Sequence, residues 1–262
     1  MSDRVAVAAA GPPPLLHCSP GIRCGSYMFV SGQLSTDWVD ARPASTLLPH
    51  RGDTTRAEVR QVFRNLRAVM EAGGMSLGDV ARVDNFYGHR AVSTGHFAAR
   101  DEAYPIDAME KPASTAVQTA AFPAAGSTYG IEAIGVAGGR EGIYTDAVAT
   151  SPARLPMGIR AGAFVFLSGR MASDYRAGLA PEARTAEWSW LGSPIHKQTE
   201  YILGMLEDIL AEAGLSLADV VKTEVFLRDP SELVVAKAPA VRQRRGRRDP
   251  ADLLRLALPD LR

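Results

Sequence analysis

The sequence predicts an α+β protein made of two tandem copies of one unit, each a β-sheet covered on one face by two helices. One observation is that residues 21–32, GIRCGSYMFVSG, return at residues 158–169 as GIRAGAFVFLSG. A second is that residues 74–88, GMSLGDVARVDNFYG, return at residues 214–228 as GLSLADVVKTEVFLR. Two matches in the same order at nearly the same offset indicate an internal duplication, and a duplication decides the architecture.

Each copy opens with a short strand. Tyr27–Val30 and Phe164–Leu167 are apolar runs that are followed directly by Ser-Gly. An apolar run that stops at a turn signal is typical of a buried strand.

An amphipathic helix follows in each copy. Apolar residues recur there at i, i+3, i+4 and i+7, the spacing that places them on one helix face. Glycines at 73, 74 and 214 supply the stop signals. The apolar positions are Val59, Val62, Phe63, Leu66, Val69 and Met70 in the first copy and Ile202, Met205, Leu206, Ile209, Leu210 and Ala213 in the second.

Ser76 and Ser216 each precede a Leu-x-Asp-Val sequence, which predicts a single helical turn opened by a serine cap. Strands are expected directly afterwards, at Val80–Tyr87 and Val220–Leu227.

The first copy then continues with elements that the second copy does not repeat clearly. A second helix is expected over Thr94–Tyr104, bounded by Pro105. Two strands are expected at Thr115–Ala121 and Tyr129–Val136, joined by a Phe-Pro-Ala-Ala-Gly turn.

These elements divide the chain into three parts. We expect residues 1–12 to be a flexible arm, residues 13–140 to form domain 1 and residues 145–262 to form domain 2. The similarity between the copies ends near residue 235, and Arg242–Arg248 holds five arginines. One interpretation of this tail is a basic patch for an acidic partner. The other, which we favour, is a solvated tail or a reading-frame accident that replaced the true last strands.

Charge and composition exclude several classes of protein. Lys plus Arg is 29 and Asp plus Glu is 29, which argues against a nucleic-acid binder or a protein of anionic membrane surfaces. No apolar stretch of about 18 residues predicts a membrane-spanning helix. Cys18 and Cys24 are the two cysteines, too few for a disulfide scaffold. A bridge between them would close a very short loop, so we favour reduced thiols in a cytoplasmic protein. The five histidines show no metal-ligand spacing, and no metal site is expected.

The motifs GIRxGxxxFVSGQ, EAGG-x-SLxDV, KPA-S-T-AVQ and IEAI together resemble the Rid family (YjgF/YER057c/UK114, also called endoribonuclease L-PSP). The resemblance covers about residues 12–138 and 148–235. It implies a chorismate-mutase-like fold and trimer-type packing, with small-molecule clefts between neighbouring units. It also implies hydrolysis of reactive imines or enamines to a keto compound and ammonia, without metal or organic cofactor.

One departure from the family pattern bears directly on that chemistry. A 2-imino acid carries a carboxylate, which is best held by a bidentate arginine. In the active deaminases of the family this arginine stands at the position of Ser114, while a cysteine matches Ala116 and a tyrosine matches Cys18. Loss of such a clamp costs on the order of 2–5 kcal/mol of binding. We therefore do not expect a standard 2-imino-acid deaminase.

The candidate site is nevertheless the cleft of domain 1, with a small imine- or enamine-type metabolite as substrate. Ser114 would hydrogen-bond the substrate, the Gly32 backbone would position an oxygen, and Glu132 would orient the attacking water. Further candidates for substrate binding are Gln33, Cys18, Ala116, Phe86 and Tyr129.

The alternative is a non-catalytic member of the family, a small-molecule-binding or assembly module that keeps the fold without the clamp. Ribonuclease activity is disfavoured by the zero net charge. The expected partners are a small molecule and further copies of the chain, with no membrane and no nucleic acid.

Overall fold

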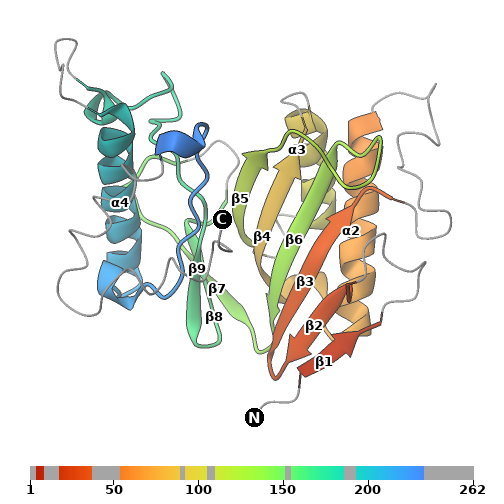
Figure 1. Ribbon diagram of the computed structural model, residues 1–262. Coiled ribbons are helices and arrows are strands. Elements are labelled where there is room, and N and C mark those ends of the chain that lie inside the picture. Colours follow the sequence, from red (N-terminus) through yellow and green to blue (C-terminus); the bar gives the residue numbers. More distant parts are fainter. Residues whose placement is uncertain are drawn as a thin grey trace, which may run out of the picture. The chain divides into compact units, whose positions relative to one another are not determined.

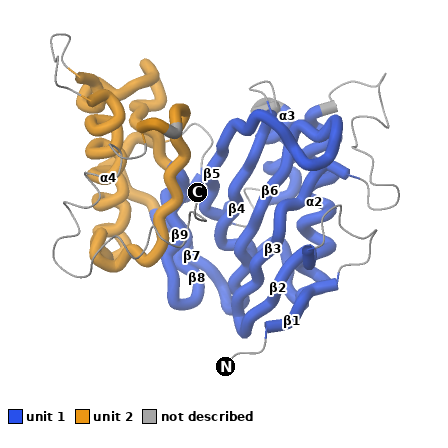
Figure 2. The backbone as a smooth tube through the Cα atoms, in the orientation of Figure 1, with its two compact units in different colours: residues 1–143, 155–169 blue, residues 144–154, 170–262 orange. Residues whose placement is uncertain are grey.

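The computed structural model divides the chain into two compact units (Figure 2). Unit 1 comprises residues 1–143 and 155–169, and unit 2 comprises residues 144–154 and 170–262. This division differs from the expected boundary between residues 140 and 145, because the first strands of the second copy cluster with unit 1. The described residues are 4–8, 18–36, 54–88, 92–104, 110–150, 155–185 and 193–232.

Unit 1 is built on a six-stranded sheet of order β1-β2-β3-β6-β4-β5 (Figure 1). The β4–β5 pair is parallel, and every other pair is antiparallel. The strands expected around residues 80–87 and 129–136 are confirmed. The strands are β1 (Arg4–Val7), β2 (Gly21–Cys24), β3 (Tyr27–Leu34), β4 (Val80–Tyr87), β5 (Ala113–Gln118) and β6 (Tyr129–Val136).

The strand expected at Thr115–Ala121 is found at Ala113–Gln118, and two features near the N-terminus also differ from the sequence expectation. Residues 1–12 were expected to be a flexible arm, but Arg4–Val7 pair with β2 and Val7 is buried in the core. Strand β3 does not stop at Ser-Gly: it continues to Leu34 through an irregularity between Val30 and Gln33. A bulge of this kind absorbs an extra residue without ending the ladder.

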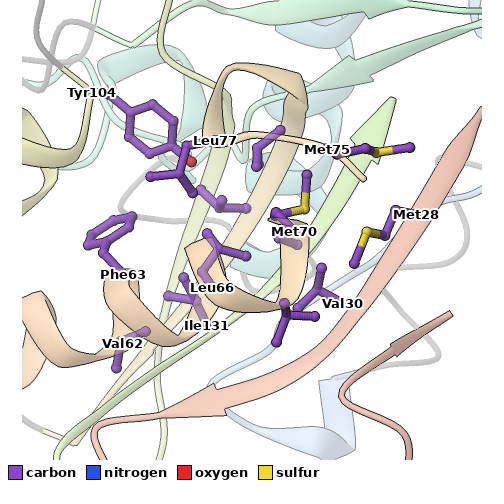
Figure 3. Close-up of a cluster of buried hydrophobic side chains, with 14 of the residues drawn as sticks. Met28, Val30, Val62, Phe63, Leu66, Met70, Met75, Leu77, Tyr104 and Ile131 are labelled. Atoms are coloured by element: carbon purple, nitrogen blue, oxygen red, sulfur yellow. The ribbon is translucent and has the colours of Figure 1, made fainter. Parts of the chain in front are cut away.

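Two helices cover one face of this sheet, as expected. They are α2 (Thr54–Ala72) and α3 (Val92–Ala103) (Figure 1). The apolar stripe of α2 packs on β3 and β6, and Figure 3 shows Leu66 and Met70 beside Met28 and Ile131. The architecture is therefore α+β.

The turn after α2 follows from its serine cap. The Ser76 hydroxyl accepts a hydrogen bond from the N–H of Gly78, and Asp79 closes a capping box onto the Ser76 N–H. Ser216 and Asp219 make the same box in unit 2, so the repeated Ser-Leu-x-Asp sequence encodes the same turn twice.

A second, three-stranded sheet of unit 1 consists of β7 (Arg140–Ile143), β8 (Gly158–Ala161) and β9 (Phe164–Leu167). It packs on the face of the main sheet that the helices leave open. Ile159 and Ala161 are buried there against Ala81, Ala113 and Val136.

Unit 2 contains the helix α4 (Pro194–Glu212), which Ser193 caps and Gly214 follows. The prediction of a strand at Val220–Leu227 is wrong, because residues 221–227 form no strand among the described residues. In unit 1 the equivalent β4 is fixed by ladders with β5 and β6, and the described part of unit 2 has no counterpart of those two strands.

The divergent tail, including Arg242–Arg248, lies outside the described residues. Within the described ranges, no helix is both long enough and apolar enough to cross a membrane. Cys18 and Cys24 are not joined by a disulfide.

Candidate functional site

The predicted site residues divide between the two faces of the main sheet. Side chains alternate along a strand, so neighbours in sequence point to opposite faces. On β6, Tyr129 and Ile131 belong to the core beneath the helices, and Glu132 points to the opposite face, which we call the outer face. Because Tyr129 and Glu132 are three residues apart on β6, their side chains lie on opposite faces of the sheet.

Ser114 lies on β5, is 8% exposed, and has all of its polar groups in hydrogen bonds. Its hydroxyl accepts from the side-chain amide of Asn85 at 2.8 Å. Its backbone N–H donates to the Ser168 hydroxyl at 3.0 Å, and its carbonyl accepts from the Gly169 N–H at 3.1 Å. Ser168 in turn donates to the carbonyl of Pro156 at 2.6 Å.

These contacts join the two copies within unit 1. Ser168 and Gly169 are the second-copy equivalents of Ser31 and Gly32, and they directly follow β9. We call the antiparallel pair of β8 and β9 the second hairpin. Position 114 thus holds the end of this second hairpin.

Asn85 connects Ser114 to Tyr129. The Tyr129 hydroxyl donates to Oδ1 of Asn85 at 2.7 Å, and Nδ2 of Asn85 donates to both the Ser114 hydroxyl and the Thr115 carbonyl at 2.8 Å. Asn85 is 1% exposed and Tyr129 is 0% exposed. Burial raises the pKa of Tyr129 well above its usual value, so this hydroxyl stays protonated and acts as a donor.

His96 on α3 packs against this network, with its ring centroid 5.3 Å from that of Tyr129. Burial, reinforced by the charge of Arg100, lowers the pKa of His96 to about 4. His96 is therefore neutral at pH 7. Its Nδ1 atom is buried and makes no hydrogen bond within the described residues.

Two buried cations near the start of β5 bind a carboxylate of the protein itself. Nζ of Lys111 and a guanidinium nitrogen of Arg100 lie 2.8 and 2.9 Å from the same oxygen of Asp101. Burial alone would raise the pKa of Asp101, but the hydrogen bonds from Lys111 and Arg100 outweigh it and lower that pKa. Both cations are thus engaged by Asp101.

Three predicted residues lie away from Ser114. Glu132 and Phe86 are on the outer face, and Gly32 is at the irregularity of β3. Glu132 is exposed and stands directly across from Asp84 on β4. A Cβ atom placed on Gly32 would lie 3.9 Å from Oε1 of Glu132, so these two residues are neighbours. Phe86 is half-buried and pairs with Gly130. The structure brings Gly32 and Glu132 together but does not bring Ser114 to them.

The remaining predicted residues show no common arrangement. Gln33 is buried, and its side-chain amide donates to the carbonyl of Ser31 at 2.9 Å. Cys18 is exposed ahead of β2, and Ala116 is exposed on β5.

Sequence reasoning missed Asn85, the residue at the centre of the buried network. A signal was present, because asparagine is disfavoured in strands and residue 85 falls between the core positions Val83 and Tyr87. A buried amide at such a position needs several partners.

Over the described ranges, no group of three or more His, Cys, Asp or Glu residues is arranged to hold a metal ion.

Comparison with known proteins matches most of the chain to one family model. The family model described as Endoribonuclease L-PSP matches twice, over residues 9–137 and 147–252. RutC family protein PH0854 of Pyrococcus horikoshii is 30% identical over 117 residues, which cover 43% of this chain and 81% of that protein.

Two solved structures are similar to about half of this chain. The YjgF gene product of E. coli is 22% identical, covers 51% of this chain and 98% of its own, and has a TM-score of 0.44. RidA of the Antarctic bacterium Psychrobacter sp. is 27% identical, covers 50% of this chain and 98% of its own, and has a TM-score of 0.42.

Proposed function

Because this chain belongs to the endoribonuclease L-PSP (Rid) family, with two tandem matches to it, we propose that it is a non-catalytic assembly module of the Rid fold. In this proposal the position that holds the substrate carboxylate in the family's deaminases joins the two copies instead. Hydrolysis of 2-imino acids at Ser114 is not its function.

The observation that carries this proposal is the set of hydrogen bonds at Ser114. Its hydroxyl, N–H and carbonyl are bonded to Asn85, Ser168 and Gly169. A substrate at this position would have to displace bonds that hold the end of the second hairpin. Buried polar groups left without partners cost about 1–3 kcal/mol each.

Charge supports the same conclusion. A serine offers no positive charge to a carboxylate, and Arg100 and Lys111 are both bound to Asp101. An imino acid at Ser114 would therefore lack the ion pair that offsets the free-energy cost of removing its carboxylate from water.

The test measures ammonia release from imines that an amino-acid oxidase generates in situ from neutral, acidic and basic amino acids. The wild type is compared with Ser114→Arg and with Gln118→Arg, which adds the same charge at an exposed position of β5. We expect no ammonia above the rate with oxidase alone for any of the three. Release by the wild type, or a gain in Ser114→Arg without one in Gln118→Arg, contradicts the proposal.

Ser114→Ala keeps the test informative if the arginine variant does not fold. It removes the acceptor of the Asn85 amide but leaves both backbone bonds. We expect a loss of about 1 kcal/mol of stability and no change in ammonia release.

A second candidate is imine or enamine hydrolysis at the outer face, which the proximity of Gly32 and Glu132 favours. There Glu132 would orient water and the Gly32 backbone would position a substrate oxygen. This candidate predicts that Glu132→Gln lowers ammonia release about 10²–10⁴-fold, while Glu141→Gln, at an exposed position of β7, leaves it unchanged.

Trimer-type packing, a cytoplasmic location and independence from cofactors accompany both candidates and stay predictions.

A further inference from the structure

The segment of residues 220–226 in unit 2 has the sequence of a central strand but is not part of a sheet among the described residues. Its first-copy equivalent, residues 80–86, belongs to β4, which pairs with β6 on one side and with β5 on the other. The repeat thus supplies an internal example of this segment in its paired state.

The apolar side chains of the segment are exposed. Val221, Val225 and Phe226 are 62%, 59% and 49% exposed. Their equivalents at two of these positions, Ala81 and Asn85, are 0% and 1% exposed in unit 1. A β-prone segment whose apolar side chains are exposed in this way is a template for pairing with another strand.

The charges of the segment are arranged symmetrically about Thr223. Lys222 and Glu224 lie on either side of it and form an ion pair of 2.6 Å within the chain. If two such segments run antiparallel with Thr223 opposite itself, Lys222 faces Glu224 of the partner subunit. The reciprocal pair forms by symmetry, so both charges of each chain meet an opposite charge.

The apolar residues obey the same symmetry. In this register Val221 faces Val225 of the partner subunit, on the same face as Thr223. On the other face, Phe226 lies opposite Val220 of the partner subunit. β-branched pairs and opposite charges directly across from each other are favourable cross-strand contacts.

We propose that residues 220–226 form an antiparallel strand pair with the same segment of a second copy of this chain, with Thr223 on the two-fold axis. A two-fold interface requires a surface that is complementary to itself, and the sequence VVKTEVF meets this requirement in one register. The contact is independent of any reaction at unit 1.

Charge reversal tests the proposal, with assembly followed by sedimentation over a wide range of protein concentration. The wild type is expected to associate two-fold through this segment, in addition to any trimer-type packing of its units. Lys222→Glu and Glu224→Lys each place two like-charged pairs across the interface, so each alone should dimerise about 10-fold more weakly or worse.

An equal mixture of the two variants is the decisive arm. A Lys222→Glu chain and a Glu224→Lys chain complement each other across the strand pair, so the mixture should recover the affinity of the wild type. The ion pair within each chain stays broken in the mixture, and recovery therefore reports pairing between chains. Lys197→Glu and Glu200→Lys, which break an ion pair on α4, are matched controls that should leave assembly unchanged.

A cross-link tests the register directly. In a background with Cys18→Ser and Cys24→Ser, Thr223→Cys should form a disulfide-linked dimer under mild oxidation, because opposite Cα atoms lie about 4.5–5.5 Å apart. Val221→Cys should not, since it faces position 225. A monomeric wild type, single variants that assemble like the wild type, or a mixture that does not recover would each overturn the proposal.

Discussion

The hydroxyl of Tyr129 donates a hydrogen bond of 2.7 Å to the side-chain oxygen of Asn85, at a place where neither residue is more than 1% exposed. The same asparagine donates to the Ser114 hydroxyl. The bonds therefore run from β6 through β4 to β5 and tie three strands together beneath the helices. A buried network whose members are all satisfied specifies one arrangement of the strands that carry it.

Removal of the Tyr129 hydroxyl should destabilise unit 1. In Tyr129→Phe the Asn85 oxygen loses its donor while it remains buried, at a cost of about 1–3 kcal/mol. Tyr104→Phe is the matched control, because Tyr104 is also 0% exposed and its hydroxyl makes no hydrogen bond within the described residues. We expect that variant to be neutral or stabilising. Urea unfolding compares the two, and equal losses would contradict the role given to the Asn85 bond.

His96 should make unit 1 sensitive to acid. Its pKa is about 4 in the folded protein, mainly because of burial, against about 6.5 in the unfolded chain. Below pH 6.5 the unfolded state takes up a proton that the folded state does not, so stability falls as the pH drops from about 6.5 to about 4. The full loss approaches about 3 kcal/mol.

The measurement is hydrogen exchange of the β4 and β6 amides at pH 7 and at pH 4.5. In His96→Leu the loss between these two pH values should be smaller than in the wild type. His196→Gln, on α4, should retain the loss of the wild type. A pH dependence that is the same in His96→Leu and in the wild type would show that another group causes it.

Local sequence patterns predicted the elements that are determined by residues only a few positions apart. The apolar period of α2 and the Ser76 cap each lie within one short window, and both are found in the structure. Tyr129 and Glu132 are three residues apart on one strand, so their opposite faces also follow from the sequence once β6 is recognised.

The features that the sequence did not predict depend on contacts between distant parts of the chain. Residues 80–87 and 220–227 have the same pattern, but among the described residues only the first segment is paired in a sheet, with β5 and β6. Arg4–Val7 form a strand because they pair with β2. The Asn85–Ser114 bond depends on the parallel register of β4 and β5, which no single window of sequence contains.

Two equivalent glycines test how the second hairpin is attached in unit 1. Gly25 and Gly162 both have positive φ, 60° and 56°, so alanine is strained at either position. A Cβ atom at Gly25 would meet nothing within 4 Å, whereas one at Gly162 would lie 2.6 Å from the Tyr27 hydroxyl. That hydroxyl also accepts a hydrogen bond of 3.0 Å from the Ala163 N–H.

We therefore expect Gly25→Ala to cost about 1–2 kcal/mol through the backbone alone, and Gly162→Ala to cost more by the energy of moving Tyr27. Tyr27→Phe removes the hydroxyl that the new methyl group would strike, so it should cost less in the Gly162→Ala background than in the wild type. A double-mutant cycle of unfolding free energies measures this coupling. If the two glycine variants lose the same stability and the cycle shows no coupling, Tyr27 does not hold the turn between β8 and β9.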